Sequence, residues 1–433
     1  MKILLVKPSY YGRDGRLVKL RKGKRIELTL PLLAALTPRN IEIEIIDETI
    51  QNVPFHTESD LIGITSLTRN AFRAYELADQ FRQLGKKVVL GGIHATFLPD
   101  EALAHSDAVV LGEAEAVWQH LLNDFEKGNL QKIYSGKSLH NLKGIPPPRF
   151  DLLDLKNYRV HIFPVQDTRG CTLHCEFCSV APFFRNKVLS RPIEDVLRDI
   201  NSLKALGARR FFFVDENIAV GKKYMKDLLK ALIPLKIEWM GQSSIQIVDD
   251  SEFMDLAVAS GCFLLEIGFE SLNPKNLSNC GKRFGSIEKY VRAIQILRAN
   301  KIIIGASMIF GFDHDDGSIF SDTLNFLNEH DVPIMDSYIL TPAPGTPIAR
   351  SLLAEGRIYC TDWSRYGGED VVFRPALMSA ETLEHEFWSM KKRFYSMGNI
   401  VRRLFHVPLE RIPVVAYVNL SNLLQLNLVF DSV

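Results

Sequence analysis

Three cysteines within eight residues form the clearest group of metal-binding side chains in the sequence. Cys171, Cys175 and Cys178 have the spacing C-x3-C-x2-C and follow a short apolar segment. Thiolates on one such loop can hold three corners of an iron–sulfur cubane, and three protein ligands leave one iron open to another molecule. A structural zinc site is the alternative, but zinc needs a fourth Cys or His at a matching spacing, and His174 is adjacent to Cys175. The spacing therefore favours an iron–sulfur cluster with one open iron.

The other three cysteines, Cys262, Cys280 and Cys360, are isolated in the sequence. Lone cysteines are typical of buried small side chains, and clustered cysteines without a disulfide framework indicate a reducing compartment. We therefore expect a cytoplasmic protein. The N-terminal segment MKILLVKPSYYG lacks the pattern of a signal peptide, and no stretch of about 20 uncharged apolar residues predicts a membrane-spanning helix.

The composition indicates a folded protein of more than one domain. The chain has 433 residues, of which 46% are hydrophobic and 24% charged, and its formal net charge is +1. This length predicts two or three domains, and this composition predicts packed cores rather than disorder. Since positive and negative charges balance, we expect no nucleic-acid partner.

Short β-branched segments alternate with amphipathic ones over the first 130 residues. The predicted strands are 3–6, 41–46, 61–65, 88–92 and 108–112, and the predicted helices include 71–85 and 115–128. Continuous apolar strands between helices indicate a doubly wound α/β sheet of the Rossmann or flavodoxin type, which binds ligands beyond the carboxyl ends of its strands. We expect this domain over residues 1–140, followed by a proline-rich linker over 141–160.

A second alternation of strands and helices begins near residue 160. Its predicted strands are 163–168, 209–215, 237–242, 263–271, 302–309 and 334–340, with helices such as 192–207 between them. Six such units indicate a partial (β/α)6 barrel over 161–345, in which chemistry gathers at the carboxyl ends of the strands. The cysteines follow the first of these strands. The remaining residues, 346–433, are predicted to be mostly helical.

Together with the aromatic Phe177 before the last cysteine, the cysteine motif resembles the signature of the radical S-adenosylmethionine (SAM) superfamily. The resemblance implies that the open iron binds the amino and carboxylate groups of SAM. Reductive cleavage would then give methionine and a 5′-deoxyadenosyl radical that abstracts a hydrogen atom from the substrate. Polar groups at the strand ends are implied as SAM contacts, although a solvated acid is the alternative for Glu216. The implied SAM contacts are Phe177, Glu216, Asn217, Gln242, Glu270, Ser271 and Gly305.

The N-terminal domain resembles the cobalamin-binding domain that precedes the barrel in one large radical SAM subgroup. The resemblance rests on Gly91-Gly92-Ile93-His94 after the fourth predicted strand and Gly112-Glu113-Ala114-Glu115 after the fifth. Glycines at these places would let the backbone approach the corrin ring. The implied cobalamin contacts are Ser66, Thr68, Gly91, Gly92, His94, Gly112 and Glu113.

The cobalt-binding motif D-x-H-x-x-G of many cobalamin domains is missing from this sequence. His56 is not followed three residues later by Gly, and His94 is followed by Ala-Thr-Phe. We therefore expect cobalamin without a lower His ligand, with His94 ordering a loop or touching a corrin amide. A domain that has lost cobalamin is the alternative. Methylthiotransferases share the cluster but carry three further cysteines in an N-terminal domain, whereas Cys171 is the first cysteine here.

The end of the barrel, 340–358, resembles that of a subfamily with hopanoid methylases and bacteriochlorophyll-pathway enzymes. Tyr338 is a candidate substrate-facing residue, with a core tyrosine as the alternative. Apolar and basic residues interleave in the C-terminal region, which suits a peripheral membrane contact, although ordinary helix packing gives the same pattern. These residues are Trp388, Phe394, Tyr395, Leu404 and Phe405, with Lys391, Lys392, Arg393, Arg402 and Arg403. A membrane contact would place the protein at a membrane and suit a hydrophobic substrate.

The sequence thus predicts a cobalamin-dependent radical SAM enzyme that methylates an unactivated carbon of a lipid, terpenoid or tetrapyrrole. Its expected cofactors are a [4Fe–4S] cluster, SAM and cobalamin, and its expected electron donor is a reductase, flavodoxin or ferredoxin. Radical cyclisation, rearrangement or oxygenation without methyl transfer is the second hypothesis. An iron–sulfur sensor is the third, although a sensor needs no barrel-like cofactor cleft.

Overall fold

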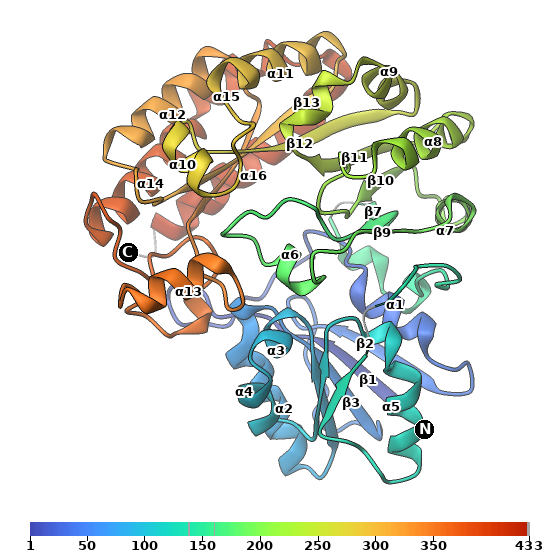
Figure 1. The fold of residues 1–433 in the computed structure, drawn as a ribbon. Helices are drawn as coiled ribbons and strands as arrows, with labels where there is room; N and C mark the ends of the chain where they lie inside the picture. Colours follow the sequence, from blue (N-terminus) through green and yellow to red (C-terminus); the bar gives the residue numbers. More distant parts are fainter. Residues whose placement is uncertain (137–138, 160, 431–433) are drawn as a thin grey trace.

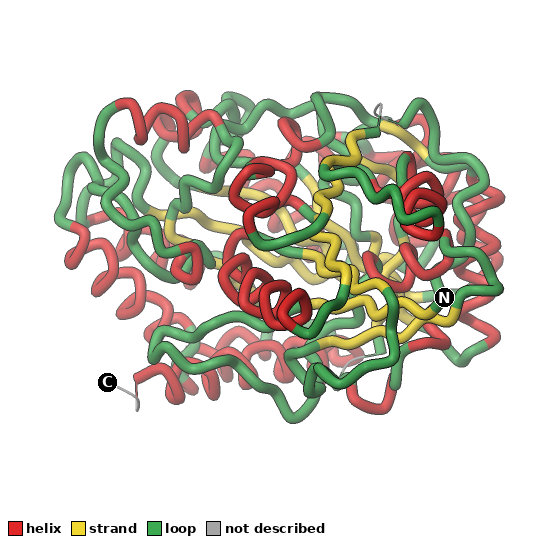
Figure 2. The backbone as a smooth tube through the Cα atoms, turned by 90° about the horizontal axis from the view of Figure 1, so that it is seen from below, coloured by secondary structure: helices red, strands yellow, loops and turns green. Residues whose placement is uncertain are grey.

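Two six-stranded sheets, each with its strands parallel, organise the chain. The structure is a computed structural model that describes residues 1–136, 139–159 and 161–430, the last four of these by backbone alone. The first sheet and its helices form the lower half of Figure 1, and the second forms the upper half. Seen from below, the strands lie in the middle and the helices largely around them (Figure 2). The predicted α/β class with two successive parallel-sheet units is confirmed.

The N-terminal sheet has the strand order β2-β1-β3-β4-β5-β6, which is the flavodoxin-like order with one edge strand added. Its strands are β1 Lys2–Lys7, β2 Glu42–Asp47, β3 Leu61–Thr65, β4 Lys87–Gly91, β5 Ala108–Leu111 and β6 Ile133–Ser135. Its helices are α1 Thr29–Leu36, α2 Ala71–Gln83, α3 Ile93–Phe97, α4 Pro99–Ala104 and α5 Trp118–Glu126. The five predicted strands are confirmed, whereas β6 and α1 were not predicted from the sequence.

Both faces of this sheet are buried. Leu4 packs with Phe81 of α2 in a cluster on one face, and Leu5 packs with Trp118 of α5 in a cluster on the other. Because neighbouring strand residues point to opposite faces and both faces are covered, the strands are continuous apolar runs.

The second sheet has the order β14-β13-β12-β11-β10-β7, and its two edge strands, β14 and β7, do not pair, so the barrel is partial. The strands are β7 Ile162–Val165, β10 Arg210–Phe213, β11 Glu238–Ser243, β12 Cys262–Glu270, β13 Ile303–Phe310 and β14 Ile334–Ile339. The outer helices are α7 Ile193–Ala205, α8 Lys222–Leu232, α9 Ser251–Ala259, α11 Ile287–Ala299 and α12 Ser318–Glu329, which form an arc around the strands in Figure 1. All six predicted units are present.

The C-terminal region is helical, as predicted. It contains α13 Pro347–Ala354, α14 Ala380–Phe394, α15 Met397–Leu404 and α16 Ile412–Phe430. Helix α14 packs against α12 and β14, and α16 closes the N-terminal edge of the barrel. Within the described ranges, the chain has no helix of the length and hydropathy needed to cross a membrane.

The C-terminal aromatic residues divide into two groups. Trp388, Phe394 and Tyr395 are buried in the main core, and the Tyr395 hydroxyl donates to the Met335 carbonyl at 2.5 Å. Ordinary helix packing therefore accounts for these three residues. Phe405, in contrast, is 82% exposed.

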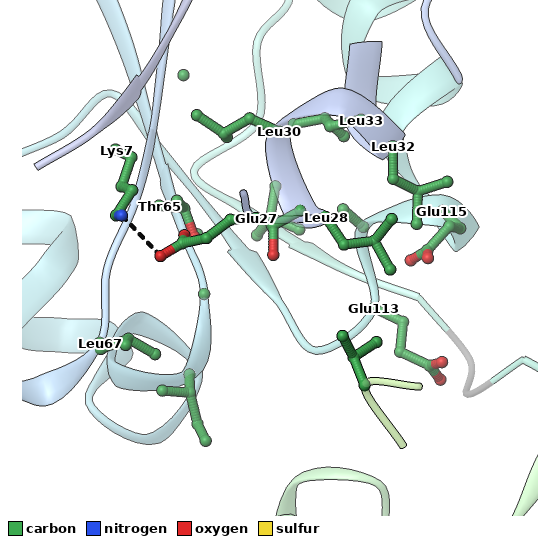
Figure 3. Close-up of a pocket in the computed structure, with 18 of the residues that line it drawn as sticks. Lys7, Glu27, Leu28, Leu30, Leu32, Leu33, Thr65, Leu67, Glu113 and Glu115 are labelled. Atoms are coloured by element: carbon green, nitrogen blue, oxygen red, sulfur yellow. Dashed lines mark ion pairs between the residues drawn. The ribbon is translucent and has the colours of Figure 1, made fainter. Parts of the chain in front are cut away.

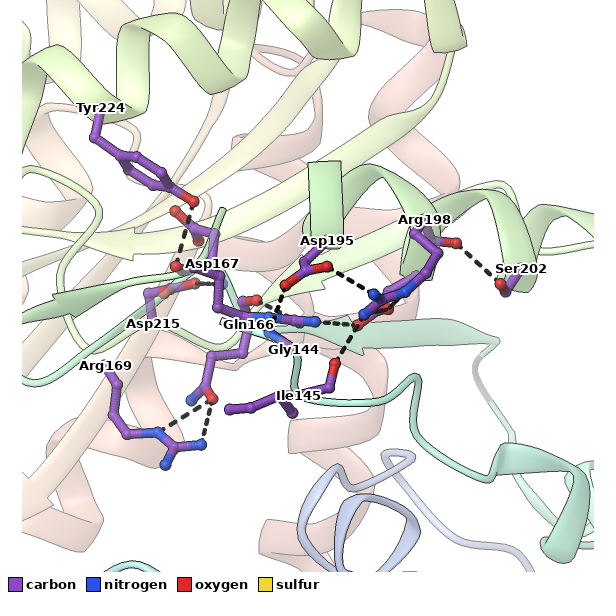
Figure 4. A network of polar contacts seen from close by, with 12 residues as sticks. Gly144, Ile145, Gln166, Asp167, Arg169, Asp195, Arg198, Ser202, Asp215 and Tyr224 are labelled. Atoms are coloured by element: carbon purple, nitrogen blue, oxygen red, sulfur yellow. Dashed lines mark hydrogen bonds and ion pairs between the residues drawn. The ribbon is translucent and has the colours of Figure 1, made fainter. Parts of the chain in front are cut away.

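The proline-rich segment after β6 contacts both halves of the molecule. The Arg149 amide donates to the Pro31 carbonyl at 2.9 Å, and the Gly144 amide donates to Asp195 of α7 at 3.0 Å. The segment is thus an ordered connection, and Figure 4 shows its contact with α7. Residues 137–138, 160 and 431–433 lie outside the described residues, and the domain boundaries remain predictions.

Candidate active site

The cysteine loop lies between β7 and α7 at the carboxyl edge of the barrel. It contains a short antiparallel pair, β8 Thr168–Arg169 and β9 Leu189–Ser190, and helix α6 Val180–Phe183. Cys171 and Cys175 are buried, Cys178 is half-buried, and all three are free thiols. The Cys178 amide donates to the Cys175 carbonyl at 3.0 Å, which closes a tight turn.

The same loop offers no single-ion site. Among the described residues, no three His, Cys, Asp or Glu side chains converge closely enough to hold one metal ion. A tetrahedral zinc ion needs four converging ligands, whereas a cubane holds each cysteine at a different corner. The three thiols of this loop offer one ligand for each of three corners of a cluster.

Carboxylates that follow β10 hold the start of the cysteine loop. Asp215 accepts from the Thr168 amide and from the Thr168 hydroxyl, the latter at 2.7 Å. Glu216 accepts from the Gly170 amide at 3.0 Å, and burial raises the pKa of Glu216. Gly170 has a φ of 92°, and a Cβ there would lie 2.0 Å from the Lys187 carbonyl oxygen, so only glycine fits.

A second buried carboxyl, Asp167, lies beside Asp215 (Figure 4). Burial and the neighbouring Asp215 carboxylate raise the pKa of Asp167 well above its usual range. The same Asp215 side chain accepts the hydrogen bonds of Thr168, so it is shared between Asp167 and the start of the cysteine loop.

Most of the residues implied as SAM contacts lie at this same edge. Glu216 and Asn217 follow β10, Gln242 is near the end of β11, and Glu270 and Ser271 end β12. The Asn217 side-chain oxygen accepts from the Ser244 amide at 3.0 Å and so ties the ends of β10 and β11 together. The assignment of these residues to SAM remains a proposal.

Two of the implied SAM contacts differ from this arrangement. Gly305 is the third residue of β13, where it pairs with Glu266 of β12 and Ile334 of β14, so it lies deeper in the barrel than the strand ends. Phe177 packs edge-on against Phe312, which follows β13, with ring centroids 6.0 Å apart. Phe177 thus docks the cysteine loop against the far side of the barrel mouth.

Glu270 forms a buried ion pair that sequence reasoning missed. Its carboxylate lies 2.5 Å from the Lys282 ammonium, and both side chains are 8% exposed. Burial lowers the pKa of Lys282, but Glu270 and Cys175 raise it more, so the net shift is upward. The Glu176 amide donates to the Cys280 carbonyl at 3.2 Å, which places this pair under the cysteine loop. No sequence motif marks Lys282.

A cavity of about 570 Å³ lies between the two sheets (Figure 3). Its walls come from the carboxyl ends of β3, β4 and β5, from residues 25–36, and from β7 and β10 of the barrel. Leucines of α1 and the preceding turn give one apolar wall, and the Lys7–Glu27 ion pair, at 2.6 Å, lies at its edge. The loops that line it are those in which a flavodoxin-like sheet binds ligands.

Four of the seven residues implied as cobalamin contacts line this cavity, namely Gly91, Gly92, Gly112 and Glu113. Gly112 has a φ of 72°, and no atom lies within 4 Å of where its Cβ would be, so the glycine leaves open space. The Thr96 hydroxyl donates to the Gly92 carbonyl at 2.8 Å and accepts from the Gly112 amide at 2.9 Å. This threonine fixes the two glycine loops relative to each other, and the resulting cradle fits a bulky apolar ring.

The other three, Ser66, Thr68 and His94, are not among the lining residues. Ser66 is buried, with its hydroxyl 3.4 Å from the Gly91 carbonyl oxygen. His94 is fully buried, lies 3.3 Å from Glu101 and packs edge-on against Trp363. Burial lowers the pKa of His94, which keeps it neutral. The contacts with Glu101 and Trp363 suit a residue that orders a loop, and a contact of His94 with a corrin amide stays a prediction.

Arg169 joins the cysteine loop to the wall of the cavity. Its guanidinium lies 2.8 Å from Glu113 and 2.7 Å from Glu115, and these three side chains are at most 12% exposed. Gln166 accepts from the same guanidinium at 2.8 Å (Figure 4). Arg169 precedes Cys171 by two residues, whereas the two glutamates follow β5 of the other domain. We name these three residues the Arg169 clamp.

Three polar side chains, those of Glu266, Asp336 and Tyr338, form a group inside the barrel. Burial and the neighbouring Asp336 raise the pKa of Glu266 to about 8. Asp336 and Tyr338 are two residues apart on β14 and therefore point to the same side of the strand. Tyr338 is 42% exposed, so it is not a core tyrosine. Arg25, which lines the cavity, lies close enough to Glu266 to lower its pKa somewhat, so this group lies near the cavity.

Comparison with known proteins identifies the family. A model of the radical SAM superfamily matches residues 165–327, and a model of the B12 binding domain matches residues 33–122. Bacteriochlorophyllide d C-12(1)-methyltransferase from Chlorobaculum tepidum is 32% identical over 392 residues, which cover 88% of this chain and 85% of that protein. This chain belongs to the cobalamin-binding radical SAM methyltransferases. The C-8(2)-methyltransferase of the same organism is 29% identical over 404 residues, covering 90% of this chain and 89% of the relative.

A solved structure of this family has the same fold. The radical SAM methyltransferase TsrM from Kitasatospora setae, with cobalamin and a [4Fe–4S] cluster bound, superposes with a TM-score of 0.68 at 16% identity, covering 95% of this chain and 89% of that chain. As a cobalamin-binding radical SAM methyltransferase, the protein uses the three expected cofactors: the cluster, SAM and cobalamin. The predicted enzyme class and cofactors are thereby confirmed.

Proposed function

We propose that this enzyme methylates an unactivated carbon of a tetrapyrrole or a similarly large hydrophobic molecule. The observation that carries the proposal is the Arg169 clamp, which fixes the cysteine loop against the cavity of the cobalamin-binding domain. A radical that forms at the cysteine loop and a methyl group that is held in the cavity would then act on one substrate between them. The relatives act on bacteriochlorophyllides, which supports a tetrapyrrole.

Different residues of this chain would bind the cluster, SAM and cobalamin. Cys171, Cys175 and Cys178 would hold the cluster, and Glu216 would orient the SAM ammonium. The backbone at Gly91, Gly92 and Gly112 would support the corrin. When bound, the cluster and SAM supply a hydrogen-abstracting radical, and cobalamin supplies the methyl group.

Glu266, Asp336 and Tyr338 would contact the substrate. At neutral pH the Glu266 carboxyl is largely protonated and can donate a hydrogen bond, while Asp336 can accept one. Such a pair suits the polar substituents at the edge of an apolar macrocycle. Apolar walls nearby, such as Phe212, would exclude water from the radical. A small one-electron donor, such as a flavodoxin or ferredoxin, would reduce the cluster.

The test is an anaerobic reaction with methyl-labelled SAM, a one-electron reductant and a bacteriochlorophyllide. Labelled methyl in the tetrapyrrole, with both 5′-deoxyadenosine and S-adenosylhomocysteine formed, is the expected result. Deoxyadenosine without S-adenosylhomocysteine would instead support cyclisation or rearrangement, and neither product would support a sensor. The Cys171→Ala variant should form no deoxyadenosine, whereas Cys360→Ala, which removes an isolated thiol, should react as wild type.

A further inference from the structure

Helix α16 carries no charged residue along its length. Its inner side is fixed across the N-terminal edge of the barrel, where Val415 is buried against Phe263 and Ile303. The Asn419 amide donates to the Pro333 carbonyl at 3.0 Å, and Arg403 donates to the Asn419 side chain at 2.7 Å. Since these contacts are buried, the orientation of the helix is set by the barrel.

The outer side of α16 and the turn before it are apolar and exposed. Tyr417, Leu420 and Leu424 follow a helical spacing and are 44%, 41% and 64% exposed, and Phe405 and Leu409 are 82% and 83% exposed. We call these five residues the α16 face. The helix also carries polar residues, such as the exposed Gln425, but none is charged. Large exposed apolar patches mark interaction sites.

Basic residues lie at the barrel edge that α16 covers. The loops that lead into β10, β11 and β13 carry Arg209, Lys236 and Lys301, each exposed and without an ion pair within the described part of the chain. These strands begin at the edge of the barrel that α16 covers. The local field is therefore positive next to an apolar surface.

Two acidic residues at this edge, Glu238 and Asp331, are paired with basic residues, whereas Glu329 at the end of α12 is exposed. Glu238 pairs with Arg210 at 2.8 Å and also with Arg411, which directly precedes α16. Asp331 lies 3.8 Å from Arg402 and 3.5 Å from His406. Only Glu410 is an exposed acid on the turn itself. An apolar face with a basic border is complementary to an anionic lipid surface.

We propose that the α16 face docks the enzyme on the surface of an anionic membrane, with Phe405 and Leu409 inserted between the headgroups and Arg209, Lys236 and Lys301 near the lipid phosphates. The helix lies along the membrane plane and does not cross it. Because α16 covers the N-terminal edge of the barrel, the opposite edge, with the cysteine loop and the cavity, faces away from the lipid and stays accessible to a reductant. This proposal does not depend on the identity of the substrate.

The test is co-sedimentation of the full chain with vesicles of phosphatidylcholine alone or with about one quarter phosphatidylglycerol. We expect binding to the anionic vesicles that weakens with added salt, and a loss of about fivefold or more in the bound fraction for the Phe405→Asp/Leu409→Asp variant. Leu353→Asp is the matched control, because Leu353 is 68% exposed on α13, away from this face; it should bind as wild type.

The oligomeric state in solution tests whether a second copy of the chain, and not a membrane, covers the α16 face. A wild-type dimer that becomes monomeric in the Phe405→Asp/Leu409→Asp variant would assign the face to a second copy of the chain and overturn the proposal. Wild-type protein that binds neither kind of vesicle, or equal binding by both variants, would overturn it as well. Circular dichroism should show that both variants remain folded, since all three residues are largely exposed.

Discussion

Glu266 is a buried carboxyl whose pKa is raised strongly by its surroundings. Asp336 of β14, Glu270 of its own strand and Arg25 of the N-terminal domain face it, and burial together with Asp336 raises its pKa to about 8 from 4.5. The folded chain therefore holds a proton that the unfolded chain releases near pH 4.5. Accordingly, the free energy of unfolding should fall as the pH rises from about 4.5 through about 8.

Replacement of Glu266 by Gln removes this titration but keeps a neutral hydrogen-bonding group. We expect Glu266→Gln and wild type to melt at similar temperatures near about pH 4, where the carboxyl is protonated in both the folded and the unfolded wild-type chain, and the variant to be the more stable near about pH 8. Thermal unfolding at the two pH values measures this, and the exposed Glu410→Gln is the control. If wild type and Glu266→Gln lost the same thermal stability between the two pH values, Glu266 would not be the group that titrates.

Glu216 has two roles that can be separated, one inferred from the sequence and one seen in the structure. Its carboxylate accepts from the Gly170 amide, and it is also the proposed partner of the SAM ammonium. Glu216→Gln keeps an acceptor for Gly170 but loses the charge-assisted bond, about 1.5–3 kcal/mol, so SAM binding should weaken by about 10-fold or more. Its iron content should match wild type, whereas Glu216→Ala should also lose iron. Anaerobic SAM titration and iron analysis measure the two effects. Unchanged SAM affinity in Glu216→Gln would show that Glu216 does not bind the SAM ammonium.

The sequence made Cys171, Cys175 and Cys178 recognisable because their chemistry is encoded in local spacing. Lys282 and Arg169 were missed because their partners are distant in sequence: Lys282 is 12 positions from Glu270, and Arg169 is 56 positions from Glu113. Only the fold brings such pairs together, and the types of the residues alone do not mark them.

At the scale of elements, strands were predicted best where burial on both faces makes them continuous apolar runs, as in β3. Strand β6 has three residues, of which two are exposed, and therefore lacks that pattern. Helix α1 contains Pro31 and has no polar face, so its periodicity is weak. His94 follows a glycine motif, but it lies on α3, whose packing turns it toward Trp363. Sequence order thus located the cavity loops but not which of their side chains face the cavity.

Gly112, which follows β5, and Gly128, which follows α5, are a matched pair of glycines. Gly112 and Gly128 both have a φ of 72° with no atom within 4 Å of an added Cβ, but only Gly112 lines the cavity. Replacement of either by Ala should cost about 1–2 kcal/mol of backbone strain. We expect both variants to lose similar stability and only Gly112→Ala to bind cobalamin more weakly, as measured by anaerobic absorbance titration. Equal cobalamin affinity in the two variants would place the corrin elsewhere.

At the scale of the whole molecule, the Arg169 clamp is a buried ion-pair contact between the two cofactor regions. Arg169 is on the cysteine loop, and Glu113 and Glu115 follow β5 of the cobalamin-binding domain. Removal of the buried guanidinium alone would leave two unpaired carboxylates, at a cost of about 3–5 kcal/mol. The Arg169→Met variant should therefore lose stability regardless of any role in the reaction.

A triple variant separates stability from function. In Arg169→Met/Glu113→Gln/Glu115→Gln no buried charge is left unpaired, so thermal stability should return most of the way to that of wild type. The triple variant would still lack the ion pairs that hold the cysteine loop against Glu113 and Glu115. Neutral amides do not replace these charge-assisted hydrogen bonds. Cleavage of SAM would take place among the cysteine loop and the strand ends of the barrel, whereas methylation also needs the cavity of the N-terminal domain in the correct position relative to them. We therefore expect this variant to form 5′-deoxyadenosine at close to the wild-type rate but to yield several-fold less methylated product per deoxyadenosine. Quantifying both products in one anaerobic reaction gives the ratio; a wild-type ratio in the folded triple variant would show that the clamp contributes only to stability.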